Sequence, residues 1–282
     1  MTRASSGVSP VGVAARTGPT VPTGHAGHAE PTRLLGIVSA LPEELAAILE
    51  MVEAPQTTEV AGRRLHRGHL QGHEVVLTLS GMGKVATALT TTLLIERFGV
   101  GGLLFSGVAG GLGPGVQVGD VVLARTLMQH DLDASPLCPR YQVPDLGMDE
   151  LPTDPTLRAA LAAAAQAVVQ APPAAAAAFG LKQPAVHEGL VISGDRFIAS
   201  SAQAATLLAE LPRALAVEME GAAMAQVCAA YRLPCAVLRL VSDRADDHAH
   251  VDFQRFLTEV ASPMSREIIA RAVAAWAQPA PR

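Results

Sequence analysis

Apolar segments of strand length recur along this chain, and each is followed by a short cluster of glycine or polar residues. The clearest are LLGIVSA, HEVVLTLSG, VGGLLFSGVAGGLG and PCAVLRLVSD. Helix-length segments such as KVATALTTTLLIERF separate them. Strands that are apolar on both faces and alternate with helices are typical of a sheet covered on both sides. The pattern predicts an α/β fold, a three-layer α/β/α sandwich around a central mixed, largely parallel sheet.

This pattern begins only at Leu34. Residues 1–33 are mostly Gly, Pro, Ser, Thr, Val and Ala, without apolar periodicity and without a segment of signal-peptide type. We expect residues 1–33 to be a disordered tail or the product of an over-early start codon. We expect residues 34–278 to form a single domain, because a chain of 282 residues, 49% of them hydrophobic, can bury a large core.

Charge and composition narrow the partners of the protein. The net charge is −5 and only 3% of residues are aromatic, which argues against nucleic acid and against a membrane surface. Residues 98–119 and 159–181 are long and uncharged, but glycine, proline and glutamine interrupt them, so neither predicts a membrane span. The three cysteines have no metal or redox spacing. We expect a soluble, cytoplasmic protein.

The clusters that follow the strands carry most of the candidate functional residues. They are Glu43 and Glu44, residues 81–84, residues 108–111, residues 195–198, residues 218–220, and Ser242 with Asp243. In α/β sheets, binding sites gather at the carboxyl ends of the strands. We therefore expect these clusters to converge and line one pocket. The simpler interpretation of Glu218 and Glu220, a solvent-exposed helix entrance favoured by the helix dipole, leaves the other clusters unexplained.

Taken together, the segments resemble the nucleoside phosphorylase/hydrolase superfamily and, more narrowly, the bacterial 5′-methylthioadenosine/S-adenosylhomocysteine nucleosidases. The matching segments, in the family's order, are GIVSALPEE, SGMGKVATAL, GVAGGL, VGDVV, GLVISGDRFI, AVEMEGAAMAQVC and LRLVSDRADDHAHVDFQRFL. They extend from about Leu34 to Trp276. The resemblance implies a nucleoside phosphorylase-like fold and hydrolysis of the N-glycosidic bond of an adenine nucleoside that carries a 5′-thioether.

The resemblance also implies three catalytic residues. Asp243 matches the acid that protonates N7 of adenine, with Ser242 orienting it, and Glu44 matches the base that activates water. Glu220 matches the ligand of the 2′- and 3′-hydroxyls of the ribose. Because an aspartate normally carries no proton at neutral pH, the pocket must raise the pKa of Asp243. Two carboxylates on opposite sides of the sugar resemble the arrangement of an inverting glycosidase.

The rest of the implied pocket contacts the base, the ribose or the 5′ group. By resemblance it consists of Phe197 and Ile198 at adenine, Ala109 and Gly110 where the backbone approaches the base and sugar, Met219 on the ribose, and Phe253 toward the 5′-alkylthio group, with Leu41 as a further substrate-binding residue. The loop HDLDASPLCPRYQVP belongs to the same 5′ pocket. In the family part of this loop comes from the neighbouring subunit, which implies a homodimer.

Three positions depart from the family or leave two interpretations open. Leu41 stands where the family often has methionine, and Val108 replaces a serine, so any polar contact of that serine is lost. Arg196 has no counterpart that assigns it a role. Glu218 either assists the site or holds Arg239 or another nearby cation.

Neither a cofactor nor a metal is implied. The motifs HDLD at residues 130–133 and HAH at residues 248–250 lack a second matching cluster of ligands. The segment SGMGK is too short for a Walker loop. Its glycines are expected to let a strand approach a helix closely.

Three alternative functions remain. A phosphorylase of the same fold needs arginines to hold phosphate, whereas SGMGK offers only Lys84 and Glu44 would repel the anion. A futalosine or aminodeoxyfutalosine nucleosidase would share the acid and the base and differ in the 5′ group. A non-catalytic nucleoside binder would have lost one of Glu44, Glu220 and Asp243, and all three are present.

Overall fold

The computed structural model describes residues 34–181, 183–244 and 253–276. Expectations for the tail at residues 1–33, for the HAH motif at residues 248–250 and for the domain end at residue 278 lie outside these ranges. The strands are β1 (Leu35–Ser39), β2 (Glu53–Val60), β3 (Arg63–Leu70), β4 (His73–Leu79), β5 (Gly102–Gly111), β6 (Val121–Gln129), β7 (Leu151–Pro152), β8 (Val186–Ser193), β9 (Ala214–Glu218) and β10 (Cys235–Asp243).

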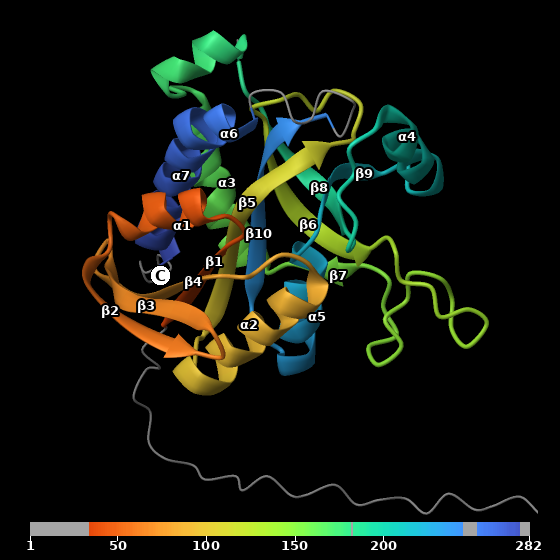
Figure 1. Ribbon diagram of the computed structural model, residues 1–282, viewed down its shortest axis with the longest axis horizontal. Helices are drawn as coiled ribbons and strands as arrows, with labels where there is room; N and C mark the ends of the chain where they lie inside the picture. Colours follow the sequence, from red (N-terminus) through yellow and green to blue (C-terminus); the bar gives the residue numbers. More distant parts are fainter. Residues whose placement is uncertain (1–33, 182, 245–252, 277–282) are drawn as a thin grey trace, which may run out of the picture. The chain divides into compact units, whose positions relative to one another are not determined.

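The helices lie between groups of these strands or after the last strand (Figure 1). They are α1 (Pro42–Leu49), α2 (Lys84–Phe98), α3 (Pro155–Val169), the 3₁₀ helix η1 (Ala174–Phe179), α4 (Ser201–Glu210), α5 (Gly221–Tyr231), α6 (Phe253–Phe256), the π-helical turn η2 (Leu257–Ala261) and α7 (Ser262–Trp276). The last three follow one another directly, so the chain is helical without interruption from residue 253 to residue 276. None of the helices in the described ranges is long and apolar enough to cross a bilayer.

The described strands form one 10-stranded mixed sheet. β1 pairs in parallel with β4 and β5, β5 pairs in parallel with β10, and β8 pairs in parallel with β6 and β9. Antiparallel pairs join β10 to β6 and β5 to β9, so β5, β10, β6, β8 and β9 close into a ring. β1, β4, β3 and β2 continue the sheet outward from β5. The ring brings the ends of strands that are distant in sequence close together.

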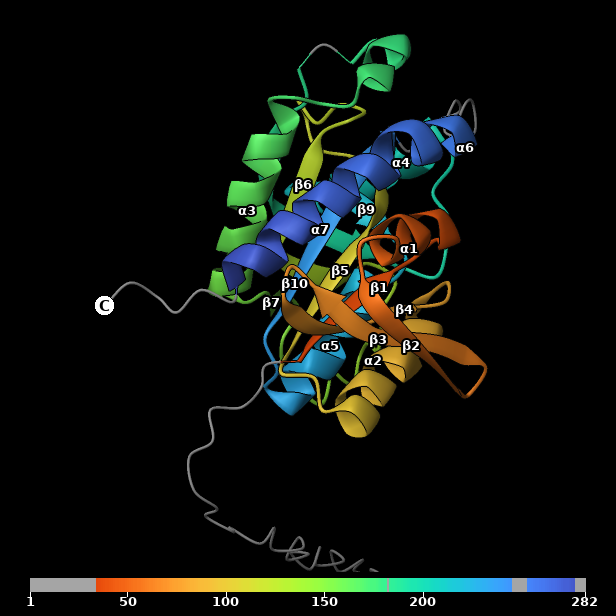
Figure 2. The same cartoon turned by 90° about the vertical axis from the view of Figure 1, so that its left-hand side faces the viewer.

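Helices cover both faces of this sheet, which confirms the predicted α/β fold class. Apolar side chains of α1, α3 and α7 pack on one face, and those of α2 and α5 pack on the other (Figures 1 and 2). β1 shows how the sequence produces the layers, because its side chains alternate between the two cores: Ile37 belongs to the first and Val38 to the second. Full burial of such a side chain contributes about 1.5–3 kcal/mol.

The helix boundaries follow from local chemistry. Pro42 occupies the first turn of α1, where its missing N–H is not needed. Gly99 ends α2 in the left-handed conformation, with φ of 65°. The Asp154 carboxylate caps α3 by accepting the N–H groups of Thr156 at 3.0 Å and Leu157 at 2.9 Å.

Two parts of the fold carry no clear signal in the sequence. α4 was not predicted, and neither was the antiparallel hairpin of β2 and β3 that extends the sheet beyond β4. β2 is exposed along almost its whole length, so it lacks the apolar alternation by which strands are recognised. It forms the outer edge of the sheet, and its pairing with β3 is interrupted by an irregularity between Glu53 and Gln56, around Pro55.

Candidate active site

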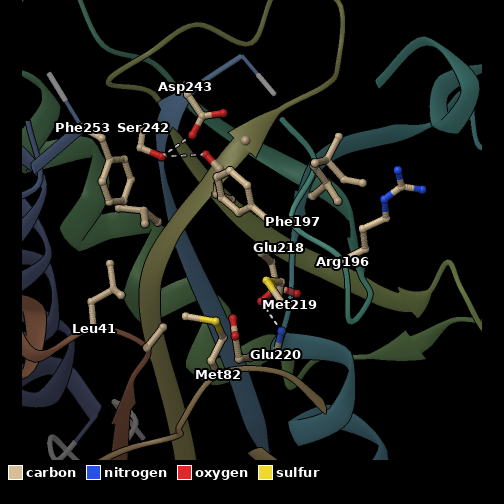
Figure 3. Close-up of a pocket in the computed structure, with 16 residues that line it drawn as sticks. Leu41, Met82, Arg196, Phe197, Glu218, Met219, Glu220, Ser242, Asp243 and Phe253 are labelled. Atoms are coloured by element: carbon tan, nitrogen blue, oxygen red, sulfur yellow. Dashed lines mark hydrogen bonds between the residues drawn. The ribbon is translucent and has the colours of Figure 1, made fainter. Parts of the chain in front are cut away.

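A pocket lies where the strand ends converge (Figure 3). Its lining comes from the segments after β1, β4 and β8, from the ends of β5, β9 and β10, and from the start of α6: Ala40, Leu41, Met82, Val108, Ala109, Gly110, Arg196, Phe197, Ile198, Val217, Glu218, Met219, Glu220, Ser242, Asp243 and Phe253. All the expected site residues are in this set except Glu44. The structure thus brings five of the six polar or glycine-rich clusters to the lining itself, and Leu41 connects the sixth to it.

Glu44 is fully buried in the first turn of α1. Its Oε2 accepts the N–H of Leu41 at 3.1 Å, so the carboxylate folds back toward the strand end that lines the pocket. Its Oε1 has no hydrogen-bond partner among the described residues. Burial raises the pKa of Glu44 to about 7, against the opposing effects of the Leu41 N–H and the Arg239 charge. The side chain can therefore accept a proton near neutral pH.

Glu220 lies at the N-terminus of α5 and is also buried. Its Oε1 accepts the backbone N–H of Gly83 at 3.0 Å. Burial and then the neighbouring Glu218 raise the pKa of Glu220 to about 7, while Arg239 and the backbone N–H groups of Gly83 and Met219 oppose the rise. In Figure 3 the carboxylate lies beside Met82 in the lower part of the pocket.

The sequence left two interpretations of Glu218 open, and the structure shows the second: Glu218 holds Arg239. Its Oε2 accepts hydrogen bonds from Nε of Arg239 at 3.2 Å and from Nη2 of the same guanidinium. The same carboxylate accepts the N–H groups of Glu220 at 3.0 Å and Gly221 at 2.8 Å, and the hydroxyl of Ser193. The Arg239 guanidinium stacks 4.1 Å from the ring centre of Phe105. Glu218 thereby fixes the turn that presents Glu220.

Asp243 ends β10 at the other side of the pocket in the view of Figure 3. Its Oδ2 accepts the hydroxyl of Ser242 at 2.8 Å, and that hydroxyl also lies 3.5 Å from the carbonyl oxygen of Ala109. The Phe197 ring lies between Asp243 and Glu220 in this view, and half of the residue is exposed. An exposed aromatic face beside a carboxyl group can stack on a flat heterocycle.

Arg196 lies at the outer side of the pocket, and Figure 3 shows its guanidinium directed away from Asp243 and Glu220. Sequence reasoning did not single out Met82, which lines the pocket, or the N–H of Gly83. The signal for Gly83 was present in SGMGK, because its φ of 84° favours glycine and a Cβ there would lie 2.8 Å from Oδ1 of Asp195.

The HDLD motif contributes to an ion pair. Asp131 Oδ1 accepts a hydrogen bond from Nζ of Lys84 at 2.6 Å. Within residues 34–181, 183–244 and 253–276, no group of three or more His, Cys, Asp or Glu side chains could hold a metal ion.

Comparison with known proteins identifies the family. The profile of the phosphorylase superfamily matches residues 34–274. The 5′-methylthioadenosine/S-adenosylhomocysteine nucleosidase of Mycobacterium tuberculosis (strain CDC 1551 / Oshkosh) is 38% identical over 244 residues, which cover 83% of this chain and 95% of that protein.

Comparison with solved structures indicates the same family. The nucleosidase of the same name from Neisseria meningitidis, in complex with methylthio-immucillin-A, gives a TM-score of 0.76 at 33% identity and covers 86% of this chain and 99% of its own. Futalosine hydrolase of Helicobacter pylori strain 26695 gives a TM-score of 0.74 at 33% identity, covering 87% of this chain and 99% of its own. The chain belongs to the phosphorylase superfamily and, within it, to the 5′-methylthioadenosine/S-adenosylhomocysteine nucleosidases.

Proposed function

We propose that this protein hydrolyses the N-glycosidic bond of 5′-methylthioadenosine and S-adenosylhomocysteine, releasing adenine and the 5′-thioribose product. The observation that carries the proposal is the state of Glu44. A fully buried carboxylate with a pKa of about 7, whose Oε1 has no hydrogen-bond partner in the described part of the chain, has the properties of a general base for water. The names of the relatives support the same reaction.

Each step uses a residue of the pocket. Glu44 takes a proton from a water molecule, whose oxygen forms a bond to C1′ of the ribose. The bond from C1′ to N9 breaks, and Asp243 gives its proton to N7, so that adenine leaves as a neutral base. Glu220 accepts hydrogen bonds from the 2′- and 3′-hydroxyls, and its negative charge favours the positive charge that builds on the sugar. No cofactor takes part in this scheme.

Water rather than phosphate is the proposed nucleophile. The pocket lining includes the carboxylates of Glu218 and Glu220, whose negative charge disfavours a bound phosphate. The guanidinium of Arg239 is already engaged by Glu218. Arg196, which does line the pocket, is directed outward in Figure 3.

A second candidate substrate differs from the two thioethers in its 5′ group. Leu41, Val108 and Phe253 form an apolar part of the lining, which suits an alkylthio substituent. The structural likeness to a futalosine hydrolase favours aminodeoxyfutalosine as the second candidate substrate.

The decisive assay is adenine release by the purified protein in phosphate-free buffer, with methylthioadenosine, S-adenosylhomocysteine, adenosine and aminodeoxyfutalosine compared. Fast release from the two thioethers is expected. Release that requires added phosphate would establish a phosphorylase, and preference for aminodeoxyfutalosine would establish the second candidate. Failure to release adenine from all four, with adenosine still binding, would establish a non-catalytic binder.

The proposal includes a homodimer in the cytoplasm, with residues 34–278 as one catalytic domain. Large apolar side chains are exposed on α2 and the loop before it: Met82 is 74% exposed and Val85 82% exposed, and Leu89 lies one turn further along α2. Leu137, in the loop assigned to the 5′ pocket of the neighbouring subunit, is 92% exposed. Such side chains on one molecule support burial against a second copy. The free cysteines are compatible with a reducing compartment.

A further inference from the structure

Three loops that are distant in sequence meet at the N-terminus of α2. The loop before α2 contributes Gly83, α2 itself begins with Lys84, the loop after β6 contributes Asp131, and the loop after β8 contributes Asp195. Asp195 Oδ1 accepts the backbone N–H of Lys84 at 2.7 Å, and the N–H of Asp195 donates to Oδ2 of Asp131 at 2.9 Å. Asp131 Oδ1 accepts Nζ of Lys84 at 2.6 Å. Lys84, Asp131 and Asp195 thus form a closed set of contacts around the N-terminus of α2.

This set is directly connected to Glu220. Two successive N–H groups at the start of α2 have carboxylate partners from different loops: that of Gly83 donates to Glu220 at 3.0 Å, and that of Lys84 donates to Asp195. A Cβ on Gly83 would lie 2.8 Å from Oδ1 of Asp195, so the loop and the carboxylate are in close contact. Since one peptide unit separates the two donors, a shift at Asp195 changes the direction of the Gly83 N–H.

Asp131 is ionised when it makes its contacts with Lys84 and Asp195. Burial acts to raise the pKa of Asp131, but the Lys84 ammonium and the Asp195 N–H outweigh it and keep that pKa below its usual value. An ionised carboxylate makes stronger hydrogen bonds to N–H donors than a neutral one. The backbone of Asp195 is therefore anchored as well as its side chain.

We propose that Asp195 is a positioning residue for the reaction: by holding the N–H of Lys84, it keeps the N–H of Gly83 directed at Glu220 and thereby sets the position of the ribose ligand. The inference rests on the proposed role of Glu220. Asp195 itself does not line the pocket, although Arg196 and Phe197 follow it directly in the chain. Asp195 acts on Glu220 through the N-terminus of α2.

The first test compares Asp195→Ala with Asp195→Asn and with Asp154→Ala, by kcat and KM for methylthioadenosine and by melting temperature. Asp154→Ala is the matched control, because the Asp154 carboxylate also accepts backbone N–H groups at a helix N-terminus, that of α3, and Asp154 does not line the pocket. We expect Asp195→Ala to lower kcat/KM about tenfold or more, the scale of a lost charged hydrogen bond. Asparagine keeps an acceptor oxygen and should restore most of the activity, whereas Asp154→Ala should lower only the melting temperature.

The second test measures whether the effect passes through Glu220. The ligand is a 7-deaza analogue of methylthioadenosine, which has no N7 to protonate, and its Kd is measured for wild type, Asp195→Ala, Glu220→Ala and the double variant. We expect Asp195→Ala to weaken binding in the wild-type background and to have little further effect once Glu220 is absent. Equal effects in both backgrounds would overturn the inference, as would an Asp195→Ala variant no less active than Asp154→Ala. Failure of the proposed function is distinguishable, since it appears as an inactive wild type, and the binding cycle still applies.

Discussion

The backbone N–H of Gly83 and the carboxylate of Glu220 meet at 3.0 Å, although 137 residues separate them in the chain. The contact joins the start of α2 to the start of α5. Glu220 is thus held by a donor from outside its own helix, and its position depends on the packing of two helices on the same face of the sheet.

The first prediction is the pH dependence of activity. A general base must be ionised, and the pKa of Glu44 is raised to about 7, so kcat/KM for methylthioadenosine should rise with pH up to about pH 7. The pKa of Glu220 is raised to about 7 as well. Because Glu220 must also be ionised to act as proposed, a plot of log kcat/KM against pH should have a slope greater than one below that pH. Initial rates from pH 5 to 9 measure this. A profile that is flat between pH 5 and 7 would contradict the assignment of Glu44.

The second prediction concerns the cost of burying Glu44. In the unfolded chain this carboxyl ionises near pH 4.5, but in the folded protein it keeps its proton until about pH 7. The raised pKa therefore contributes to the free energy of unfolding. This contribution, up to about 3 kcal/mol, is fully present below pH 4.5 and is lost as the pH rises to 7. Glu44→Gln removes this penalty and should raise the melting temperature at pH 8 but not at pH 4.

The exposed Glu50→Gln is the control for that comparison and should change the melting temperature little at either pH. Equal shifts for Glu44→Gln at pH 4 and pH 8 would show that charge burial is not the cause. The stabilised variant should be inactive, because it has no base.

The third prediction separates the proton donor from its neighbour. Asp243→Asn keeps an acceptor for the Ser242 hydroxyl and should leave the fold unchanged, but it has no proton to give to N7. Adenine release should fall by on the order of 10² to 10⁴, the usual contribution of a general acid. Ser242→Ala removes only the orienting hydrogen bond and should cost less. Near-normal turnover by Asp243→Asn would refute the role of Asp243.

The fourth prediction concerns the buried ion pair of Glu218 and Arg239. Both side chains are almost completely inaccessible to solvent, so removing one leaves the other charged and unpaired. Arg239→Ala and Glu218→Ala should each lower the free energy of unfolding by about 3–5 kcal/mol. The double variant Glu218→Gln with Arg239→Met should lose less than the sum of the two, as measured by urea denaturation.

The fifth prediction concerns association. Val85→Asp places a charge in the exposed apolar surface of α2 and should convert a dimer into a monomer in analytical ultracentrifugation. The already exposed Thr206 on α4 offers a control, because Thr206→Asp changes the charge of another helix surface without affecting that apolar patch. If wild-type protein sediments as a monomer at micromolar concentration, the dimer is refuted directly.

Several of these features could be predicted from the sequence because they have a local cause. A buried apolar strand followed by glycine or carboxylates identifies a strand end, and the ends of parallel strands meet at one edge. This reasoning located Asp243, Glu220 and Phe197 at a common pocket. It could not distinguish Glu43 from Glu44, because only the packing of α1 shows which of the two is buried.

The remaining features depend on contacts between distant segments. The Gly83 N–H finds Glu220 only when the sheet has formed, and nothing within SGMGK specifies that partner. Arg239 lies within an apolar strand pattern, and its pairing with Glu218 follows from the ring of strands rather than from spacing along the chain. β2 was missed for the opposite reason, since its exposed residues resemble those of a loop.

The exposed outer strand β2 also bears on how the protein behaves at high concentration. An open sheet edge is a place where a second chain can add a strand and begin a fibrillar aggregate. Pro55 offers no N–H to an incoming strand, the irregularity around it interrupts the ladder, and Glu53 and Glu59 bring negative charges that repel the same edge of another copy. The edge is therefore protected against strand addition, and the proposed dimer is assigned instead to the exposed apolar surface of α2.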